Sequence, residues 1–178
     1  VLAGHFHGSW DRWALGNERR GHFVYSGSPV SVTRRETGPR QATLFTVGET
    51  PTARTLRTRY FADVSITLDP LQGDEDPVKK VRDRLDELPP HAAPVLTVGG
   101  YVNAEALGTS EKEIIEQLRE LADERCVDAD FPLTDASAIL QDELFERFMN
   151  RVSEMERSED VQKRMRDMMI RAMTEVRA

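Results

Sequence analysis

Apolar and polar residues alternate in short runs along the first third of the chain. The runs are residues 1–3, 22–25, 30–32, 42–47 and 55–68. Within them, β-branched and aromatic residues recur with a period near two, which is typical of strands that bury one face. We therefore expect short strands joined by turns, and a polar, glycine-containing loop over residues 8–22.

The apolar spacing changes to that of helices beyond residue 70. Asp76-Pro77 predicts a helix start, because an acid can cap the first turn and proline suits the first helical position. Pro89-Pro90 ends that helix. Ser110 and Glu113 form the pattern of a capping box ahead of a second amphipathic helix. The strands expected in this part of the chain are residues 94–102 and 127–133.

The last part of the chain, residues 137–178, is charged and helical in pattern. One apolar stripe predicts a first helix and comprises Leu140, Leu144, Phe148, Val152 and Met155, widened by Phe145 and Met149. Ser158 interrupts this stripe and caps a last helix that carries most of the methionines. Because a terminal amphipathic helix must cover its apolar face, we expect this one to pack on its own domain or on a partner.

Composition indicates a folded protein without a membrane span. The chain has 178 residues, of which 39% are hydrophobic and 31% are charged, so it lacks the bias of a disordered segment. No apolar run reaches the length of a membrane-spanning helix, and the first residues lack a secretory signal pattern. The single cysteine, Cys126, excludes an internal disulfide and fits a reducing compartment. We therefore expect a cytoplasmic location.

Charge is divided unevenly along the chain. Residues 1–60 carry nine arginines, no lysine and four acids, a net charge of +5. Residues 61–178 carry 15 basic and 27 acidic residues, a net charge of −12. Arginine suits phosphate because its planar guanidinium donates two parallel hydrogen bonds and stays charged. The candidate nucleic-acid contacts are Arg12, Arg34 and Arg35; the alternative is that these arginines only solvate loop surfaces.

The segment Gly4-His5-Phe6-His7 carries the clearest candidate chemistry. It follows a short apolar run, and histidines two residues apart point to the same side of an extended segment. His5 and His7 are therefore candidate ligands of one metal centre at the carboxyl end of a strand. A second segment, Tyr25-Ser26-Gly27-Ser28-Pro29-Val30, follows a strand that includes His22, which we interpret as an ordinary strand residue.

Together, the two segments resemble the closing part of a calcineurin-like metallophosphoesterase domain. Within that superfamily, the chain is similar to the DNA double-strand-break repair exonuclease subunit of the D type, which pairs with an SMC-type ATPase. The resemblance implies an α+β fold that begins with the C-terminal strands of a metallophosphoesterase β-sandwich and continues with a small α/β cap domain and a helical tail. The expected parts are residues 1–56, 57–134 and 135–178.

The resemblance also implies an activity, cofactors and partners. In that family each histidine of the G-H-x-H motif binds one ion of a dinuclear centre, usually manganese, and His5 and His7 occupy those positions. Two such ions activate water and stabilise the transition state of phosphodiester hydrolysis. The cap domain would orient DNA and the tail would dock on the coiled coil of the ATPase. A homodimer of the nuclease subunit is a further arrangement that the resemblance allows.

The chain departs from the family pattern in its other metal-site elements. None of the aspartate-x-histidine, glycine-aspartate and asparagine-histidine-acid segments that normally precede G-H-x-H stands before that motif in this chain. We therefore expect the chain to be the C-terminal portion of a longer nuclease, through truncation or an incomplete gene model, and to be inactive alone. The alternative is a non-catalytic interaction module that binds an SMC-type ATPase or DNA.

Overall fold

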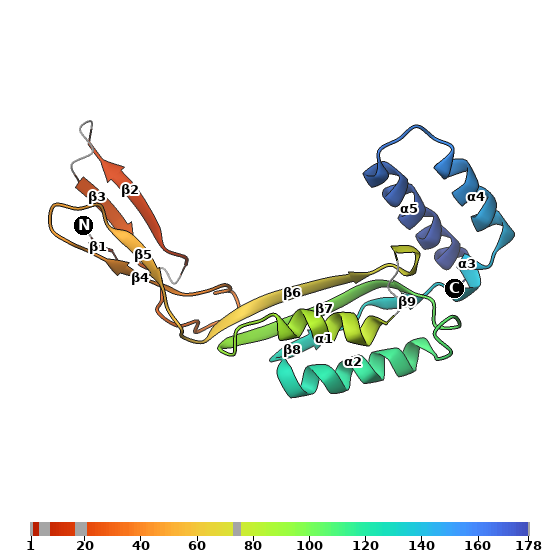
Figure 1. Cartoon of the computed structure of the whole chain (residues 1–178), viewed down its shortest axis with the longest axis horizontal. Helices are drawn as coiled ribbons and strands as arrows, with labels where there is room; N and C mark the ends of the chain where they lie inside the picture. Colours follow the sequence, from red (N-terminus) through yellow and green to blue (C-terminus); the bar gives the residue numbers. More distant parts are fainter. Residues whose placement is uncertain (1, 4–7, 17–20, 73–75, 178) are drawn as a thin grey trace. The chain divides into compact units, whose positions relative to one another are not determined.

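The computed structural model describes residues 2–3, 8–16, 21–72 and 76–177. Over these ranges the chain forms nine β-strands, five α-helices and one 3₁₀ helix, Pro70–Gln72 (Figure 1). The expectation of a mixed helix-and-strand protein is therefore confirmed. The assignment of the strands to a metallophosphoesterase sandwich, and of the later elements to its cap and tail, remains a prediction.

The first sheet has the strand order β1-β3-β2. It contains β1 (Leu2–Ala3), β2 (Asp11–Leu15) and β3 (Gly21–Tyr25). Strand β1 pairs with β3 in parallel, and β2 pairs with β3 in antiparallel. Both β1 and β3 lie where the alternating pattern predicted strands.

The expectation of a loop over residues 8–22 was wrong, because β2 lies inside it. Within the β2–β3 pair, Trp13 lies opposite Phe23, and their ring centroids are 5.7 Å apart. Cross-strand aromatic pairs of this kind stabilise a hairpin. The polar residues around Trp13 led to the prediction of a loop, because the sequence does not show that Trp13 pairs with Phe23 on the neighbouring strand.

A second, two-stranded sheet contains β4 (Gln41–Leu44) and β5 (Thr52–Thr55), which pair in antiparallel. The strand expected over residues 42–47 therefore ends earlier, at Leu44. The strand expected over residues 30–32 is absent from the described structure. The backbone N–H of Ser31 instead donates to the carbonyl of Arg59 at 3.2 Å, so this stretch is a loop attached to the chain ahead of β6.

The third sheet has four strands in the order β6-β7-β8, with β9 also paired to β7. Its strands are β6 (Tyr60–Leu68), β7 (Ala92–Val102), β8 (Asp128–Asp130) and β9 (Leu133–Asp135). At one end of β6 and β7, Tyr60 N donates to His91 O; at the other, a Cβ on Gly100 would lie 2.3 Å from Leu68 O. The two strands therefore run in the same direction, and β7 and β9 are also parallel.

Two helices connect the strands of this third sheet. Helix α1 (Pro77–Asp86) joins β6 to β7, and α2 (Glu111–Arg125) joins β7 to β8. Strands that run in the same direction need such crossover connections. Alternate residues of β6 are buried, from Tyr60 to Leu68. The side chains on one face of this strand are therefore packed, and those on the other face are partly or fully exposed.

Three helices complete the chain: α3 (Ser137–Leu140), α4 (Glu143–Ser153) and α5 (Glu159–Arg177). Their core contains Ala136, Ile139, Phe145 and Ile170, with Tyr101, Met149, Met169 and Met173 packed against it. The single helix expected for the stripe from Leu140 to Met155 was wrong, because α3 ends at Leu140 and α4 begins at Glu143; Val152 and Phe145 of the widened stripe are buried as expected. Asp142 caps a new helix by accepting from Leu144 N at 2.8 Å, and Leu144 is exposed while Phe145 is buried.

Internal packing divides the chain into two compact units. One unit comprises residues 1–65, 82–97 and 121–129, and the other comprises residues 66–81, 98–120 and 130–178. The division passes through β6, β7, α1 and α2, so the compact units are not continuous stretches of sequence. The three parts expected from the resemblance remain a prediction.

Candidate metal-binding and nucleic-acid-binding site

His5 and His7 lie outside the described residues, but the segments on both sides of them are described. Before the histidines, Leu2 pairs with Val24 and Ala3 pairs with Tyr25. Strand β1 therefore runs beside the strand that leads into the Ser26-Gly27-Ser28-Pro29 loop. Ala3, the residue before the first motif, thus lies beside Tyr25, the first residue of the second.

Gly8, the residue after His7, lies directly against the second motif. Gly27 has a φ of +67°, and a Cβ added to it would lie 2.3 Å from the carbonyl oxygen of Gly8. No side chain fits at that distance, and the left-handed conformation also favours glycine. The glycine of the second motif is therefore required by its close approach to the first.

The side chain of Arg40 connects these two segments by hydrogen bonds. Its side chain is only 4% exposed; Nε donates to Ser28 O at 2.9 Å and Nη2 donates to Gly8 O at 2.9 Å. Hydrogen bonds from a charged donor are stronger than neutral ones. Sequence reasoning missed this role, because nothing in the pattern separates a buried arginine from the eight others in the basic segment.

A hydroxyl on β4 makes a further connection between the same segments. Thr43 Oγ1 accepts from Trp10 Nε1 at 3.0 Å and lies 2.8 Å from Ser26 Oγ. Trp10 follows the first motif and Ser26 belongs to the second. Trp10 and Ser26 thus meet at the same hydroxyl of Thr43.

The metal-binding expectation stays a prediction. Within the described ranges, no three His, Cys, Asp or Glu side chains are grouped closely enough to hold a metal ion. His22 lies in β3 opposite Ala14, in the strand position expected for it. The imidazoles of His5 and His7 have the donor chemistry that manganese, iron and zinc accept.

The three arginines predicted to bind nucleic acid all have exposed side chains. Arg12 lies in β2, and its Nη1 is 3.4 Å from the carbonyl of Pro51. Arg34 forms an ion pair with Asp128 of β8. Arg34 and Arg35 are neighbours in one loop, whereas no contact in the described structure joins Arg12 to either of them.

The loop that carries Arg34 and Arg35 is built around a buried carboxylate. Glu36 accepts from Val32 N at 3.0 Å and from Thr33 Oγ1 at 3.1 Å, while its backbone carbonyl accepts from Ser31 Oγ at 2.5 Å. Glu36 N also donates to Thr33 O at 3.0 Å, which closes a turn. The two arginines therefore project from a well-defined loop.

Cys126 has the properties of a structural cysteine. Burial raises the pKa of its thiol, and the positive charge of neighbouring Arg125 only partly opposes this. A protonated thiol is a poor nucleophile and a poor metal ligand. Cys126 is therefore not a candidate for the site.

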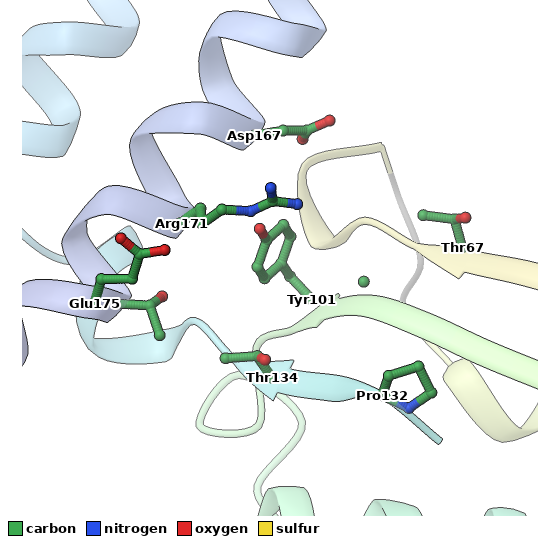
Figure 2. A pocket seen from close by; sticks show the side chains of 9 residues that line it. Thr67, Tyr101, Pro132, Thr134, Asp167, Arg171 and Glu175 are labelled. Atoms are coloured by element: carbon green, nitrogen blue, oxygen red, sulfur yellow. The ribbon is translucent and has the colours of Figure 1, made fainter. Parts of the chain in front are cut away.

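A cleft of about 390 Å³ lies among β6, β7, β9 and α5 (Figure 2). Its polar lining includes Tyr101 from β7 and Asp167, Arg171 and Glu175 from α5. The cleft lies beside the carboxyl ends of parallel strands, where ligands of α/β proteins often bind. Two carboxylates and one guanidinium do not select a ligand of one charge, so this cleft does not supply the anion-binding surface predicted from sequence.

The described helices include none with the length and hydropathy needed to cross a lipid bilayer.

Comparisons with known proteins add no relationship. No protein-family model matches the chain, and no curated protein matches it significantly.

Proposed function

We propose that this chain is the C-terminal portion of a metal-dependent DNA repair nuclease that hydrolyses phosphodiester bonds. The observation that carries the proposal is the close approach of Gly27 to Gly8, together with the hydrogen bonds that Arg40 donates to the carbonyls of Gly8 and Ser28. The G-H-F-H and Y-S-G-S-P-V segments are the residues on which the resemblance to a metallophosphoesterase rests. The approach of Gly8, the residue after the first segment, to Gly27 of the second supports the interpretation of both segments as parts of one site.

The packing of the first sheets supports a larger domain around that site. Among the side chains described before Tyr60, Val24 and Pro51 are the apolar side chains that are buried. The exposed apolar side chains in the same stretch are Trp13, Leu15, Val30, Val32, Leu44, Phe45 and Val47. Exposed apolar surface of this extent is typical of an interface with further protein. We propose that the remainder of a metallophosphoesterase domain covers it.

In this proposal His5 and His7 each hold one ion of a dinuclear centre, with manganese as the expected metal. Such a pair of ions supplies an activated water and stabilises the charge that develops on the phosphodiester. The remaining ligands, including a bridging carboxylate, would come from the part of the domain outside this chain. Arg12, Arg34 and Arg35 would contact DNA phosphates, and residues 57–134 would orient the DNA.

The coding DNA on the upstream side of Val1 tests the proposal. We expect the open reading frame to continue and to encode aspartate-x-histidine, glycine-aspartate and asparagine-histidine-acid segments. A start codon directly before Val1, with no such segments in frame, would refute the nuclease and leave the interaction module.

A second candidate function, binding of an SMC-type ATPase through the helical tail, is favoured by the exposed face of α5. Ile170 is buried in the tail's own core, yet Val161, Met168 and Val176 are exposed on the same helix. Deletion of the tail would also remove the cluster around Phe145, so point substitutions are the cleaner test. Val161→Glu and Met168→Glu should abolish capture of the ATPase in a pull-down, whereas Arg119→Glu, at an exposed position of α2, should not. Equal capture by all three variants would refute this role.

A further inference from the structure

The Arg34 guanidinium is already engaged with an anion of the same protein. Its Nη1 is paired with a carboxylate oxygen of Asp128 in β8. Carboxylate and phosphate both accept hydrogen bonds from the planar face of a guanidinium. A DNA phosphate bound to Arg34 would therefore take the position that Asp128 holds in this structure.

We propose that Asp128 competes with DNA phosphate for Arg34. The inference rests on the proposed function, since it concerns the arginines assigned there to DNA. Asp128 is a residue that neither the charge pattern nor the family resemblance identified. Its predicted role is to lower the affinity for DNA until a phosphate displaces it.

The geometry of the loop makes this competition specific to Arg34. Glu36 closes the turn and keeps the loop in one conformation through Val32 N and Thr33 Oγ1. The arginine is therefore displayed at a defined place, and Asp128 meets it there. Arg35 is the next residue, is exposed, and forms no ion pair with another described residue.

The pair is open to exchange with a ligand. The Arg34 and Asp128 side chains are 57% and 52% exposed, so solvent and DNA both have access to them. Exposed ion pairs are weak, and a phosphate can displace the carboxylate at small cost. Release of Arg34 should accordingly change DNA affinity by about threefold.

Asp130 provides a matched control for Asp128. Both acids are exposed and lie in β8, two residues apart, so their side chains point to the same face of the strand. Among the described ion pairs, Arg34 is joined to Asp128 and not to Asp130. Asp130→Asn removes the same charge from the same strand without releasing Arg34.

The experiment measures binding of the complete 178-residue chain to a short fluorescent DNA duplex by anisotropy over a series of salt concentrations. Asp128→Asn should tighten binding about threefold more than Asp130→Asn does. Because Arg34 contacts a phosphate in both complexes, Asp128→Asn should leave the dependence of log affinity on log salt unchanged, whereas Arg34→Ala should make it shallower by about 0.9, the value for one lost phosphate contact. In an Arg34→Ala background, Asp128→Asn and Asp130→Asn should have equal effects.

The outcomes separate this inference from the proposed function. If Arg34→Ala weakens DNA binding while Asp128→Asn and Asp130→Asn behave alike, the competition is refuted and the DNA-binding role of Arg34 stands. If neither Arg34→Ala nor Arg35→Ala changes affinity or salt dependence, or if the chain does not bind the duplex, the assignment of these arginines to DNA fails and the inference fails with it. Circular dichroism of each variant confirms that its fold is unchanged.

Discussion

The residues before Tyr60 and those from Tyr60 onward are stabilised in different ways. From Tyr60 onward, hydrophobic side chains fill a core in which Leu85, Leu96 and Leu118 are almost completely buried. Before Tyr60, polar contacts made by Arg40, Glu36 and Thr43 hold the loops together, and much of the apolar surface is exposed. The later elements thus bury most of their large apolar side chains, whereas the early sheets leave theirs exposed, as expected if further protein covers these sheets in the proposed nuclease.

The largest expected effect is the loss of a core leucine. Leu118→Ala should reduce the free energy of unfolding by about 3 kcal/mol, because it removes a fully buried side chain and leaves a cavity. Leu44→Ala, at a position where leucine is 52% exposed, should change it by less than about 0.5 kcal/mol. Urea denaturation followed by circular dichroism measures both. Equal losses for the two variants would contradict the contrast between the regions.

Loss of a buried ion pair should have the next largest effect on the free energy of unfolding. Arg166 of α5 pairs with Asp69 at 2.8 Å, and their side chains are 14% and 9% exposed. Arg166→Ala leaves a buried carboxylate without this partner, so we expect a loss of about 2–3 kcal/mol in the same denaturation experiment. Arg164→Ala, at an exposed position on α5, is the control and should have little effect. A loss no larger than that of the control would show that the pair does not hold α5.

Substitution of Arg40 should reduce stability locally, around β3 and β4, and not along the whole chain. Arg40→Ala removes two hydrogen bonds to carbonyls but no hydrophobic core. Hydrogen-exchange protection of β3 and β4 should fall about tenfold, while that of β6 and β7 stays unchanged. Arg54→Ala, at an exposed position of β5, should leave both regions unchanged. A uniform loss of protection along the chain would show that the two regions are one cooperative unit.

The smallest effect concerns pH and the start of α2. Hydrogen bonds from the Thr109 hydroxyl, and then from the backbone and hydroxyl of Ser110, lower the pKa of Glu113. A carboxyl whose pKa is lower in the folded state adds stability that is complete above the ordinary glutamate pKa, about 4.3. That stability is lost as the pH falls through the lowered value. Helix content measured by circular dichroism should therefore fall slightly at acidic pH in the wild type, and this component should be missing in Glu113→Gln. Identical pH profiles of the wild type and Glu113→Gln would contradict this contribution of Glu113.

Local signals predicted the later elements well. Proline at position 77 and the Ser110–Glu113 capping box marked the starts of α1 and α2, and Ser158 marked the break before α5. The box forms as expected, with Ser110 N donating to Glu113 at 3.0 Å and Glu113 N donating to Ser110 Oγ at 3.3 Å. These signals depend on neighbours a few residues apart, so a sequence contains them in full.

Contacts between distant segments were not predictable in the same way. The partner of Trp13 is Phe23 in the facing strand, and the partners of Arg40 are carbonyl groups that carry no side-chain signal. The break between α3 and α4 was also missed, because Asp142 caps a new helix, and Leu144 of the expected stripe is exposed. In the candidate site, both motif segments were proposed from the sequence, and the structure added Arg40 beside them, Glu36 in the loop of Arg34, and Asp128 as the partner of Arg34.

We propose that His5 and His7 are metal ligands of a phosphodiesterase. Mn²⁺-dependent hydrolysis of bis(p-nitrophenyl) phosphate by the polypeptide that includes the in-frame upstream segment tests this role. His5→Ala and His7→Ala should each lower the rate by at least about a hundredfold, because a metal ligand is lost. His91→Gln, a histidine that packs edge-on against Tyr60, should retain the rate within about twofold. Wild-type rates in both motif variants would contradict the account.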